Sequence, residues 1–235
     1  MFNYKERREK LYALMEAEGI DLVFLPKHTA DLDYLTGTER RVVTFGNVQY
    51  THHWVAGAFL HPKHEPKFVF PRMIVEFDSP NGVDPNTTTV SELDDAHAKF
   101  KKVAESFGKV KKIAVSSRTW GETIMHIMQI FPDATIVNAE ELVNKLRRIK
   151  SAEEIEQMTT ACHLVDDVLA QVEGRVNIGV TELDLKTEVN FQMNERGSKT
   201  ESFDTAVWSM GPKNNRDASD RRSSNPIVGG MGVSF

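Results

Sequence analysis

The sequence predicts an α/β domain over residues 1–148, followed by a second segment of different character over residues 149–235. Two observations support this division. Strand-like and helix-like segments alternate up to residue 138, which is typical of an α/β layer with helical crossovers. From Ser151 onward, two helices with clear start signals precede short strand-like segments and a long polar loop.

Composition indicates a globular protein. Of the 235 residues, 40% are hydrophobic, which is enough for a real core. The 29 Lys and Arg residues are mixed with 34 Asp and Glu residues, so we expect no nucleic-acid partner. Apolar runs are strand-length, far below the roughly 20 residues of a bilayer span, so we expect no membrane partner. The start lacks an apolar signal core, and the one cysteine fits a reducing cytoplasm.

The first elements are a helix and a strand. Residues 4–18 carry apolar side chains at helical spacing, and Gly19 follows where a C-cap glycine belongs. The run "IDLVFLP" predicts a short buried strand that ends at Pro26. Between residues 41 and 77 we expect a meander of strands in which "HPKHEPK" is a turn.

Helical spacing returns in the next segment, at Leu93, Ala96, Phe100, Val103 and Phe107. It is followed by the strand "KIAVS", a helix near "WGETIMHIMQIF" and the strand "ATIVN". The strand–helix–strand order indicates a crossover connection.

The second domain is predicted to begin with a capped helix, because Ser151 and Glu154 form a capping box. Cys162 lies on the apolar stripe of this helix. We expect it to be a packed small hydrophobe rather than a nucleophile, since no positive group in the local sequence would lower its pKa.

A second helix is predicted from Thr181, with Asp184 as its capping partner, to Gly197. The segment "ESFDTAVWSM" reads as a strand and "GPKNNRDASDRRSSNP" as a long polar loop of the kind that often carries function. The final "VSF" reads as a strand that has just begun.

The histidines of the amino-terminal third allow two interpretations. A hairpin could bring His52 and His53 near His61 and His64, which would permit a zinc site. No cysteine and no regular spacing supports that site, so solvated turn histidines are the favoured interpretation.

No motif for nucleotide binding, a zincin or a serine hydrolase occurs in the sequence. Five other segments stand out in their order and spacing: "DYLTG" at 33–37, "LRRIKSAEEIEQM" at 146–158, "IGVTELDL" at 178–185, "SFDTAVWSMGP" at 202–212 and the terminal "GMGVSF". Together they resemble the creatinase, prolidase (Xaa-Pro dipeptidase) and aminopeptidase P family. The resemblance implies a creatinase-like α/β amino-terminal domain over residues 1–148. It also implies that residues 149–235 are the first, incomplete part of an α+β pita-bread catalytic domain.

The resemblance also implies partners and substrate contacts. The amino-terminal domain of the family helps to form a homodimer and reaches over the neighbouring subunit's active site. The segment "DLDYLTG" would do so here, which makes Asp33 and Tyr34 candidates for substrate contact, although both also suit a purely structural turn.

The family holds two divalent ions, such as Mn, Co, Fe or Zn, with five ligands in the order Asp, Asp, His, Glu, Glu. These ions would activate a bridging water and polarise the scissile carbonyl. The first ligand is expected just after Phe235, so we expect no metal ligand within these 235 residues and no activity from this chain alone.

The polar loop departs from the pattern of the peptidase members. Their histidine, seven residues after the glycine of the S-G motif, corresponds to Ala218, whose methyl group cannot donate a hydrogen bond to an oxyanion. The loop offers Arg216, Arg221 and Arg222, which could bind a carboxylate or simply balance nearby aspartates.

Three hypotheses follow for the whole protein. The first is a cytoplasmic, dimeric, two-metal peptidase that cleaves short peptides before proline. The second is a hydrolase or lyase of a small non-peptide molecule on the same scaffold, which Ala218 keeps open. The third is a pita-bread binding protein that has lost its metal ions.

Overall fold

The computed structural model describes residues 2–39, 50–79, 81–198, 204–211 and 224–235. The chain divides into two compact units, residues 1–150 and 151–235, and each is described by itself. In the part of the chain that the structure describes, no helix is long and apolar enough to cross a membrane.

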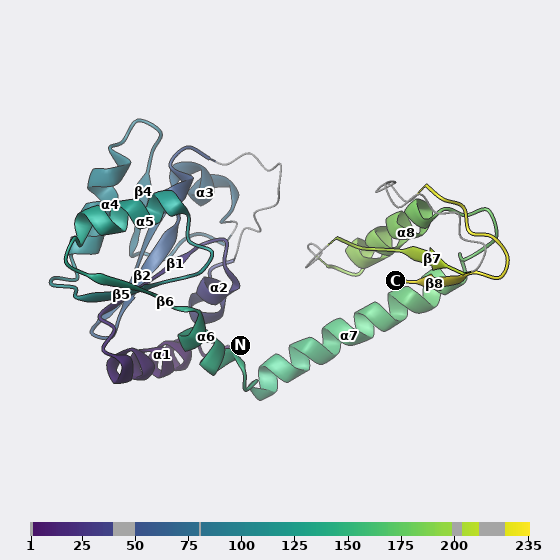
Figure 1. Cartoon of the computed structure of the whole chain (residues 1–235), viewed down its shortest axis with the longest axis horizontal. Coiled ribbons are helices and arrows are strands. Elements are labelled where there is room, and N and C mark those ends of the chain that lie inside the picture. Colours follow the sequence, from purple (N-terminus) through teal and green to yellow (C-terminus); the bar gives the residue numbers. More distant parts are fainter. Residues whose placement is uncertain (1, 40–49, 80, 199–203, 212–223) are drawn as a thin grey trace. The chain divides into compact units, whose positions relative to one another are not determined.

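The first unit is built on a six-stranded sheet with the order β4-β3-β2-β1-β5-β6 (Figure 1). Strand β2 is antiparallel to both β1 and β3, whereas the β3–β4, β1–β5 and β5–β6 pairs are parallel. The carboxyl ends of β1, β3, β4, β5 and β6 therefore lie at one edge of the sheet. The strands are β1 (Leu22–Pro26), β2 (Gly57–His61), β3 (His64–Pro71), β4 (Thr87–Val90), β5 (Lys112–Val115) and β6 (Thr135–Asn138).

Helices cover both faces of this sheet (Figure 1). Alternate residues of β1 point to opposite faces, as the pleat of a strand requires: Val23 and Leu25 belong to one buried cluster, and Leu22 and Phe24 to the other. The helices are α1 (Tyr4–Glu18), α2 (Ala30–Thr36), the 3₁₀ helix η1 (His53–Val55), α3 (Arg72–Phe77), α4 (Ala96–Glu105), α5 (Gly121–Ile130) and α6 (Glu140–Arg147).

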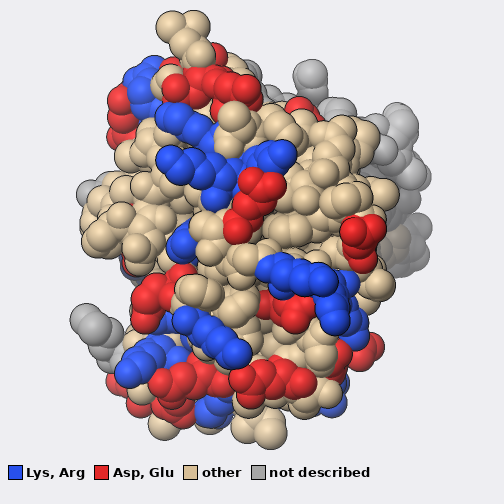
Figure 2. Space-filling view, turned by 90° about the vertical axis from the view of Figure 1, so that its left-hand side faces the viewer, with Lys and Arg blue, Asp and Glu red and all other residues tan. Residues whose placement is uncertain are grey.

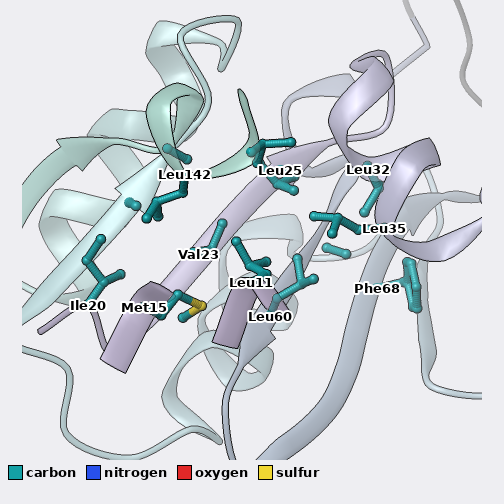
Figure 3. Close-up of a cluster of buried hydrophobic side chains, with 14 of the residues drawn as sticks. Leu11, Met15, Ile20, Val23, Leu25, Leu32, Leu35, Leu60, Phe68 and Leu142 are labelled. Atoms are coloured by element: carbon teal, nitrogen blue, oxygen red, sulfur yellow. The ribbon is translucent and has the colours of Figure 1, made fainter. Parts of the chain in front are cut away.

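The first cluster joins α1, α2 and α6 to the sheet (Figure 3). The second cluster joins α4 and α5 to the opposite face through Phe100, which contacts Phe24 and Phe59 with ring centroids 5.6 and 5.1 Å apart. The α/β layer with helical crossovers is therefore confirmed. Members of the first cluster that Figure 3 labels are Leu11, Met15, Ile20, Val23, Leu25, Leu32, Leu35, Leu60, Phe68 and Leu142.

Helix α1 forms where the sequence predicts it. Its N-cap, Asn3, accepts a hydrogen bond from the Glu6 amide at 3.1 Å, and Gly19 ends the helix in the left-handed conformation at φ 65°. The strand ending at Pro26 is also confirmed.

The predicted meander is only partly right. Residues 40–49 of that stretch lie outside the described residues, and β2 and β3 form the expected antiparallel hairpin. However, "HPKHEPK" is not a long turn, because His64 already pairs with His61. Residues 72–77 form helix α3 rather than a strand, since Asp78 donates its amide to the Ile74 carbonyl.

Two further details of the first unit differ from the sequence prediction. Strand β4, "TTTV", was not predicted, although its β-branched residues favour a strand. Helix α4 begins at Ala96 because Asp95 caps it, accepting from the Ala98 amide at 2.9 Å. Leu93 therefore precedes the helix and is 99% exposed, instead of lying on its buried stripe.

The second unit contains α7 (Ala152–Glu173), α8 (Glu182–Glu195) and the antiparallel pair β7 (Trp208–Met210) and β8 (Gly232–Ser234). Both predicted capping boxes are present, at Ser151 and at Thr181. Strand β7 is shorter than predicted, and residues 201–203 of the predicted segment lie outside the described residues. The buried cluster of the unit is Val168, Val172, Leu185, Val189, Val207 and Ile227.

The expectation that Cys162 is packed in an apolar seam is wrong, because its side chain is exposed. The stripe on α7 has helical spacing, but the cluster of this unit covers only its carboxyl-terminal end, at Val168 and Val172. Upstream, Ile155 and Met158 are 56% and 55% exposed. Spacing alone shows that a helix has an apolar face and not what covers it.

Candidate functional site

The carboxyl edge of the sheet in the first unit is the place where this fold gathers polar side chains. Ligands of open α/β sheets generally bind outside the carboxyl ends of the strands. Lys27 follows β1 there, and Arg72 and Glu92 follow β3 and β4. Each group of side chains at this edge is considered in turn.

Asp33 and Tyr34, the substrate-contact candidates, lie on α2 directly after β1. Arg7 of α1 holds this helix, because its Nη1 donates to the Tyr34 carbonyl at 2.9 Å and its guanidinium lies 4.1 Å from the centre of the Tyr34 ring. Both candidate side chains are half-buried. The geometry gives Tyr34 a packing role and leaves a substrate role for either residue as a proposal.

Asp31, one turn earlier on α2, forms an ion pair with Arg147 at the end of α6. Their Nη1 and Oδ1 atoms are 2.9 Å apart, and the Asp31 side chain is 16% exposed. Burial raises the pKa of Asp31, and the Arg147 guanidinium opposes that rise. The pair ties α2 to α6 and is structural in character.

Lys27 is a buried cation, only 2% exposed, at the carboxyl end of β1. Its Nζ donates to the carbonyls of Glu39 and Asp78 at 2.7 and 3.2 Å. It lines a cavity of about 280 Å³. The lining also includes the carboxylates of Glu39, Asp78 and Asp84, so this one lysine does not make the cavity a site for an anion. The cavity is lined by Lys27, Thr36, Gly37, Thr38, Glu39, Phe68, Phe70, Asp78, Ser79, Asn81, Gly82, Val83 and Asp84.

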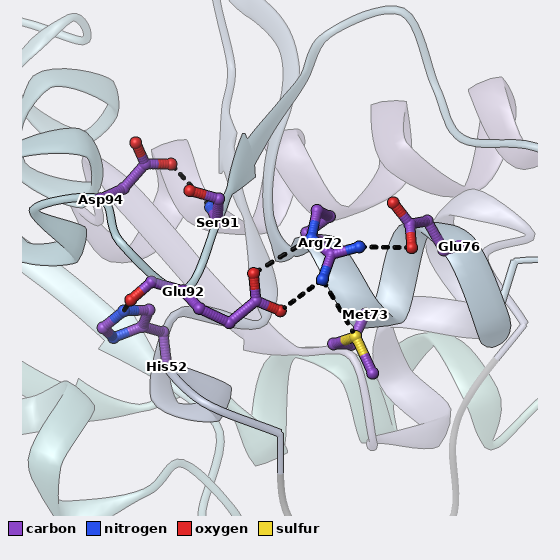
Figure 4. Close-up of polar contacts among 7 residues, drawn as sticks. All are labelled: His52, Arg72, Met73, Glu76, Ser91, Glu92 and Asp94. Atoms are coloured by element: carbon purple, nitrogen blue, oxygen red, sulfur yellow. Dashed lines mark hydrogen bonds and ion pairs between the residues drawn. The ribbon is translucent and has the colours of Figure 1, made fainter.

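A network of charged side chains joins α3 to the segment after β4 at this edge of the sheet (Figure 4). Arg72 binds both carboxylate oxygens of Glu92, at 3.0 Å from Nε and 2.9 Å from Nη2, and also contacts Glu76. The hydrogen bonds from Arg72 lower the pKa of Glu92. A bidentate pair of this kind fixes α3 against the end of β4.

The two predicted histidine pairs do not form one site. The rings of His61 and His64 are 4.7 Å apart and contact Phe107, whereas His53 contacts Trp120 and His52 lies 3.3 Å from the Glu92 carbonyl. Among the described residues, no group of three or more His, Cys, Asp or Glu side chains could hold a metal ion.

The second unit brings two of the sequence motifs together. Glu182 of "GVTE" is fully buried and accepts hydrogen bonds from both the amide and the hydroxyl of Ser209, at 2.6 and 2.7 Å. Ser209 in turn pairs with Val233 of β8. The "TEL", "VWSMGP" and "GVSF" segments therefore meet at one place.

The arginines predicted to meet a substrate carboxylate, Arg216, Arg221 and Arg222, lie outside the described residues, as does Ala218. The sequence analysis predicted neither the buried position of Lys27 nor that of Glu182. A lysine that directly follows a buried strand was the available signal for Lys27. For Glu182 there was no signal, because a glutamate in the first turn of a helix normally faces solvent.

Surface charge offers no further candidate on the face in Figure 2, where Lys and Arg side chains alternate with Asp and Glu side chains.

Comparison with known proteins places these features in a family. The model of the creatinase/prolidase N-terminal domain matches residues 7–149. The chain is 25% identical over 215 residues to an Xaa-Pro dipeptidase from Pyrococcus furiosus, covering 87% of this chain and 53% of that protein. It is 35% identical over 107 residues to the uncharacterized peptidase YqhT of Bacillus subtilis, covering 45% of this chain and 30% of that protein.

Solved structures show the same fold. A recombinant prolidase from Thermococcus sibiricus aligns over 99% of this chain and 60% of its own, with a TM-score of 0.79 and 21% identity. Prolidase from Pyrococcus furiosus aligns over 96% of this chain and 63% of its own, with a TM-score of 0.70 and 20% identity. The chain spans about a third to a half of the length of the curated relatives it matches. With its amino-terminal domain matched over 7–149 and the resemblance of its motifs confirmed, the chain belongs to the creatinase/prolidase family.

Proposed function

We propose that the whole protein is an Xaa-Pro dipeptidase-like hydrolase that cleaves short peptides before proline. In this proposal, residues 1–148 are its creatinase-like amino-terminal domain and residues 149–235 begin its pita-bread domain. The family match over residues 7–149 carries the proposal. It is supported by the likeness to an Xaa-Pro dipeptidase, which extends over 215 residues and so continues into the second unit.

The proposal includes two divalent metal ions, of the Mn, Co, Fe or Zn type, which would supply an activated water. The described residues do not fit such a site, since they assemble no group of three or more ligand side chains. The ligands are therefore proposed to come from residues other than those described, and no catalytic step is assigned to the groups seen here.

The part of this chain in the reaction would be to position the substrate. Asp33 and Tyr34 are proposed to contact it from the first unit, and Arg216, Arg221 and Arg222 to offer a cation to its carboxylate. A homodimer in the cytoplasm belongs to the same proposal, because the amino-terminal domain would then serve the neighbouring subunit.

Ala218 favours a second candidate function, a hydrolase or lyase acting on a small non-peptide molecule. A methyl group in place of the peptidase histidine removes a donor to a developing oxyanion, which acyl transfer from a peptide needs.

A substrate panel on the protein from the complete reading frame tests the proposal. Xaa-Pro dipeptides should be cleaved in the presence of Mn²⁺, whereas the matched Xaa-Ala dipeptides should not be. The 235-residue chain, assayed in parallel, should show neither Mn²⁺-dependent cleavage nor a rise in melting temperature with Mn²⁺.

Three results would decide against parts of this proposal. Failure of the complete protein to cleave any Xaa-Pro dipeptide, with retained turnover of a non-peptide amide or ester, would favour the second candidate. Failure on every substrate would reject both enzymatic functions. Metal-dependent cleavage by the 235-residue chain would show that the active site lies within these residues.

A further inference from the structure

A pair of histidines that the proposed function does not use lies on the outer face of the first unit. His97 is in the first turn of α4 and His126 is in the middle of α5. Their Nδ1 atoms are 2.8 Å apart and form a hydrogen bond, in which one imidazole donates and the other accepts. From this pair, the geometry points to a surface site for a divalent transition-metal ion that prefers imidazole, with Cu²⁺ bound most tightly.

A metal ion could replace the proton that the two nitrogens share, if they stay at about the same distance. With metal–nitrogen bonds of about 2.0–2.1 Å, two ligand atoms 2.8 Å apart subtend about 86–89° at the metal. That angle suits neighbouring ligands of a tetragonal Cu²⁺ or Ni²⁺ centre. A tetrahedral Zn²⁺ centre would need the nitrogens to separate to roughly 3.3 Å, so Zn²⁺ should bind more weakly.

The ring of His126 is already held in the orientation that a ligand needs. Trp54 stacks on it, with ring centroids 4.0 Å apart and an interplanar angle of 24°. Trp54 is itself fixed, because it is 6% exposed and its carbonyl accepts from the Thr123 hydroxyl at 2.6 Å. A fixed ring loses little freedom when it binds a metal.

The opposite nitrogen of His126 also has the expected neighbour. Metal-bound histidines usually donate their other N–H to a carboxylate, which fixes the tautomer. The Nε2 atom of His126 lies 4.0 Å from the Glu122 carboxylate, one helical turn earlier on α5. This distance is too long for a hydrogen bond, so the exposed Glu122 side chain would have to move closer when a metal binds.

Two protein ligands leave the remaining coordination positions to water. The His126 side chain is 22% exposed and Glu122 is 48% exposed, so solvent reaches the site. Mn²⁺ should not bind measurably, because it stands at the weak end of the Irving–Williams order and imidazole favours later metals. The site is thus distinct from the two-metal centre of the proposed function.

Titration of the 235-residue chain with CuCl₂ and with ZnCl₂ tests this inference, with calorimetry and thermal melting as readouts. We expect one equivalent of Cu²⁺ to bind, to raise the melting temperature and to quench the part of the tryptophan fluorescence that comes from Trp54, one of three tryptophans in the chain. His97→Gln and His126→Gln should each abolish all three effects, and Glu122→Gln should weaken binding by about ten- to hundredfold.

His61→Gln is the matched control, because His61 and His64 form another close histidine pair, but His61 Nδ1 accepts the Lys63 amide at 3.0 Å. It should leave Cu²⁺ binding unchanged. No binding by the wild-type chain, or equal binding by His97→Gln, would overturn the inference. If His126→Gln lowers the melting temperature of the metal-free chain by disturbing Trp54, the result for His97→Gln decides.

Discussion

Removal of the Glu182 carboxylate should loosen the second unit while leaving the first unit unchanged. In Glu182→Ala, the amide and the hydroxyl of Ser209 both lose the oxygen that accepts from them at 2.6 and 2.7 Å. Each orphaned buried donor costs about 1–3 kcal/mol, so the expected loss is about 2–6 kcal/mol in the free energy of opening.

Two milder variants at the same contact should destabilise the second unit less than Glu182→Ala does. Ser209→Ala removes only the hydroxyl bond and keeps the amide bond, so it should cost about 1–2 kcal/mol. Glu182→Gln keeps an oxygen acceptor at the same place and should cost less than about 1.5 kcal/mol. The expected order of destabilisation is therefore Glu182→Ala first, with the two milder variants well behind.

Amide hydrogen exchange measured by mass spectrometry suits this prediction, because it reports each unit separately. At 1.4 kcal/mol per factor of ten, Glu182→Ala should speed exchange in residues 182–195 by about 30-fold or more. Peptides from β1 should exchange at the wild-type rate. An acceleration of less than tenfold in α8, or an equal acceleration in both units, would refute the idea that this buried carboxylate holds α8 to β7.

Four further outcomes are expected. Gly57→Ala should lower the melting temperature, because a Cβ at this position would lie 2.6 Å from the Leu25 carbonyl oxygen. Overpacking of this kind costs about 1–3 kcal/mol, and each kcal/mol lowers the melting temperature by about 2–4 °C. An unchanged melting temperature would show that the strands move apart to make room. Hydrogen bonds from Lys99 and from Ser91 lower the pKa of Asp94 to about 2, below its unfolded value of 3.8. The ionised carboxylate therefore stabilises the fold above about pH 4, and this stabilisation is lost as the pH falls towards 2. The stability of Asp94→Asn should depend less steeply on pH in this range than that of the wild type. Cys162 should react fully and rapidly with a thiol reagent in the native chain, and protection would show that its helix face is covered. Tyr34→Phe in the complete protein should raise KM for Xaa-Pro dipeptides with an unchanged melting temperature if Tyr34 contacts substrate, and equal KM values would remove it from the site.

Local signals predicted the parts of the fold that depend on neighbouring residues. Gly19, Ser151 and Thr181 end or begin helices as their chemistry requires, and the structure shows the expected cap at each. The short apolar run "IDLVFLP" likewise predicted the buried strand that ends at Pro26. These features need no knowledge of the rest of the chain.

Features that depend on distant contacts were not predicted. Residues 72–77 have the composition of a strand, but β3 ends at Pro71 and these residues form helix α3. The apolar stripe through Cys162 was assigned correctly to a helix and wrongly to the interior, because burial depends on a partner surface. The closeness of His97 and His126 could not be predicted either, since 29 residues separate them and only the packing of α4 against α5 joins them.

The carboxyl edge of the sheet shows what the first unit can contribute to a reaction. The most prominent ionic side chains there already bind protein groups: Arg72 binds Glu92, and Arg147 binds Asp31. Charges engaged in this way tie helices to the end of the sheet. The described part of the first unit is therefore suited to shaping and positioning a site rather than to supplying its reactive groups, as the proposed function requires.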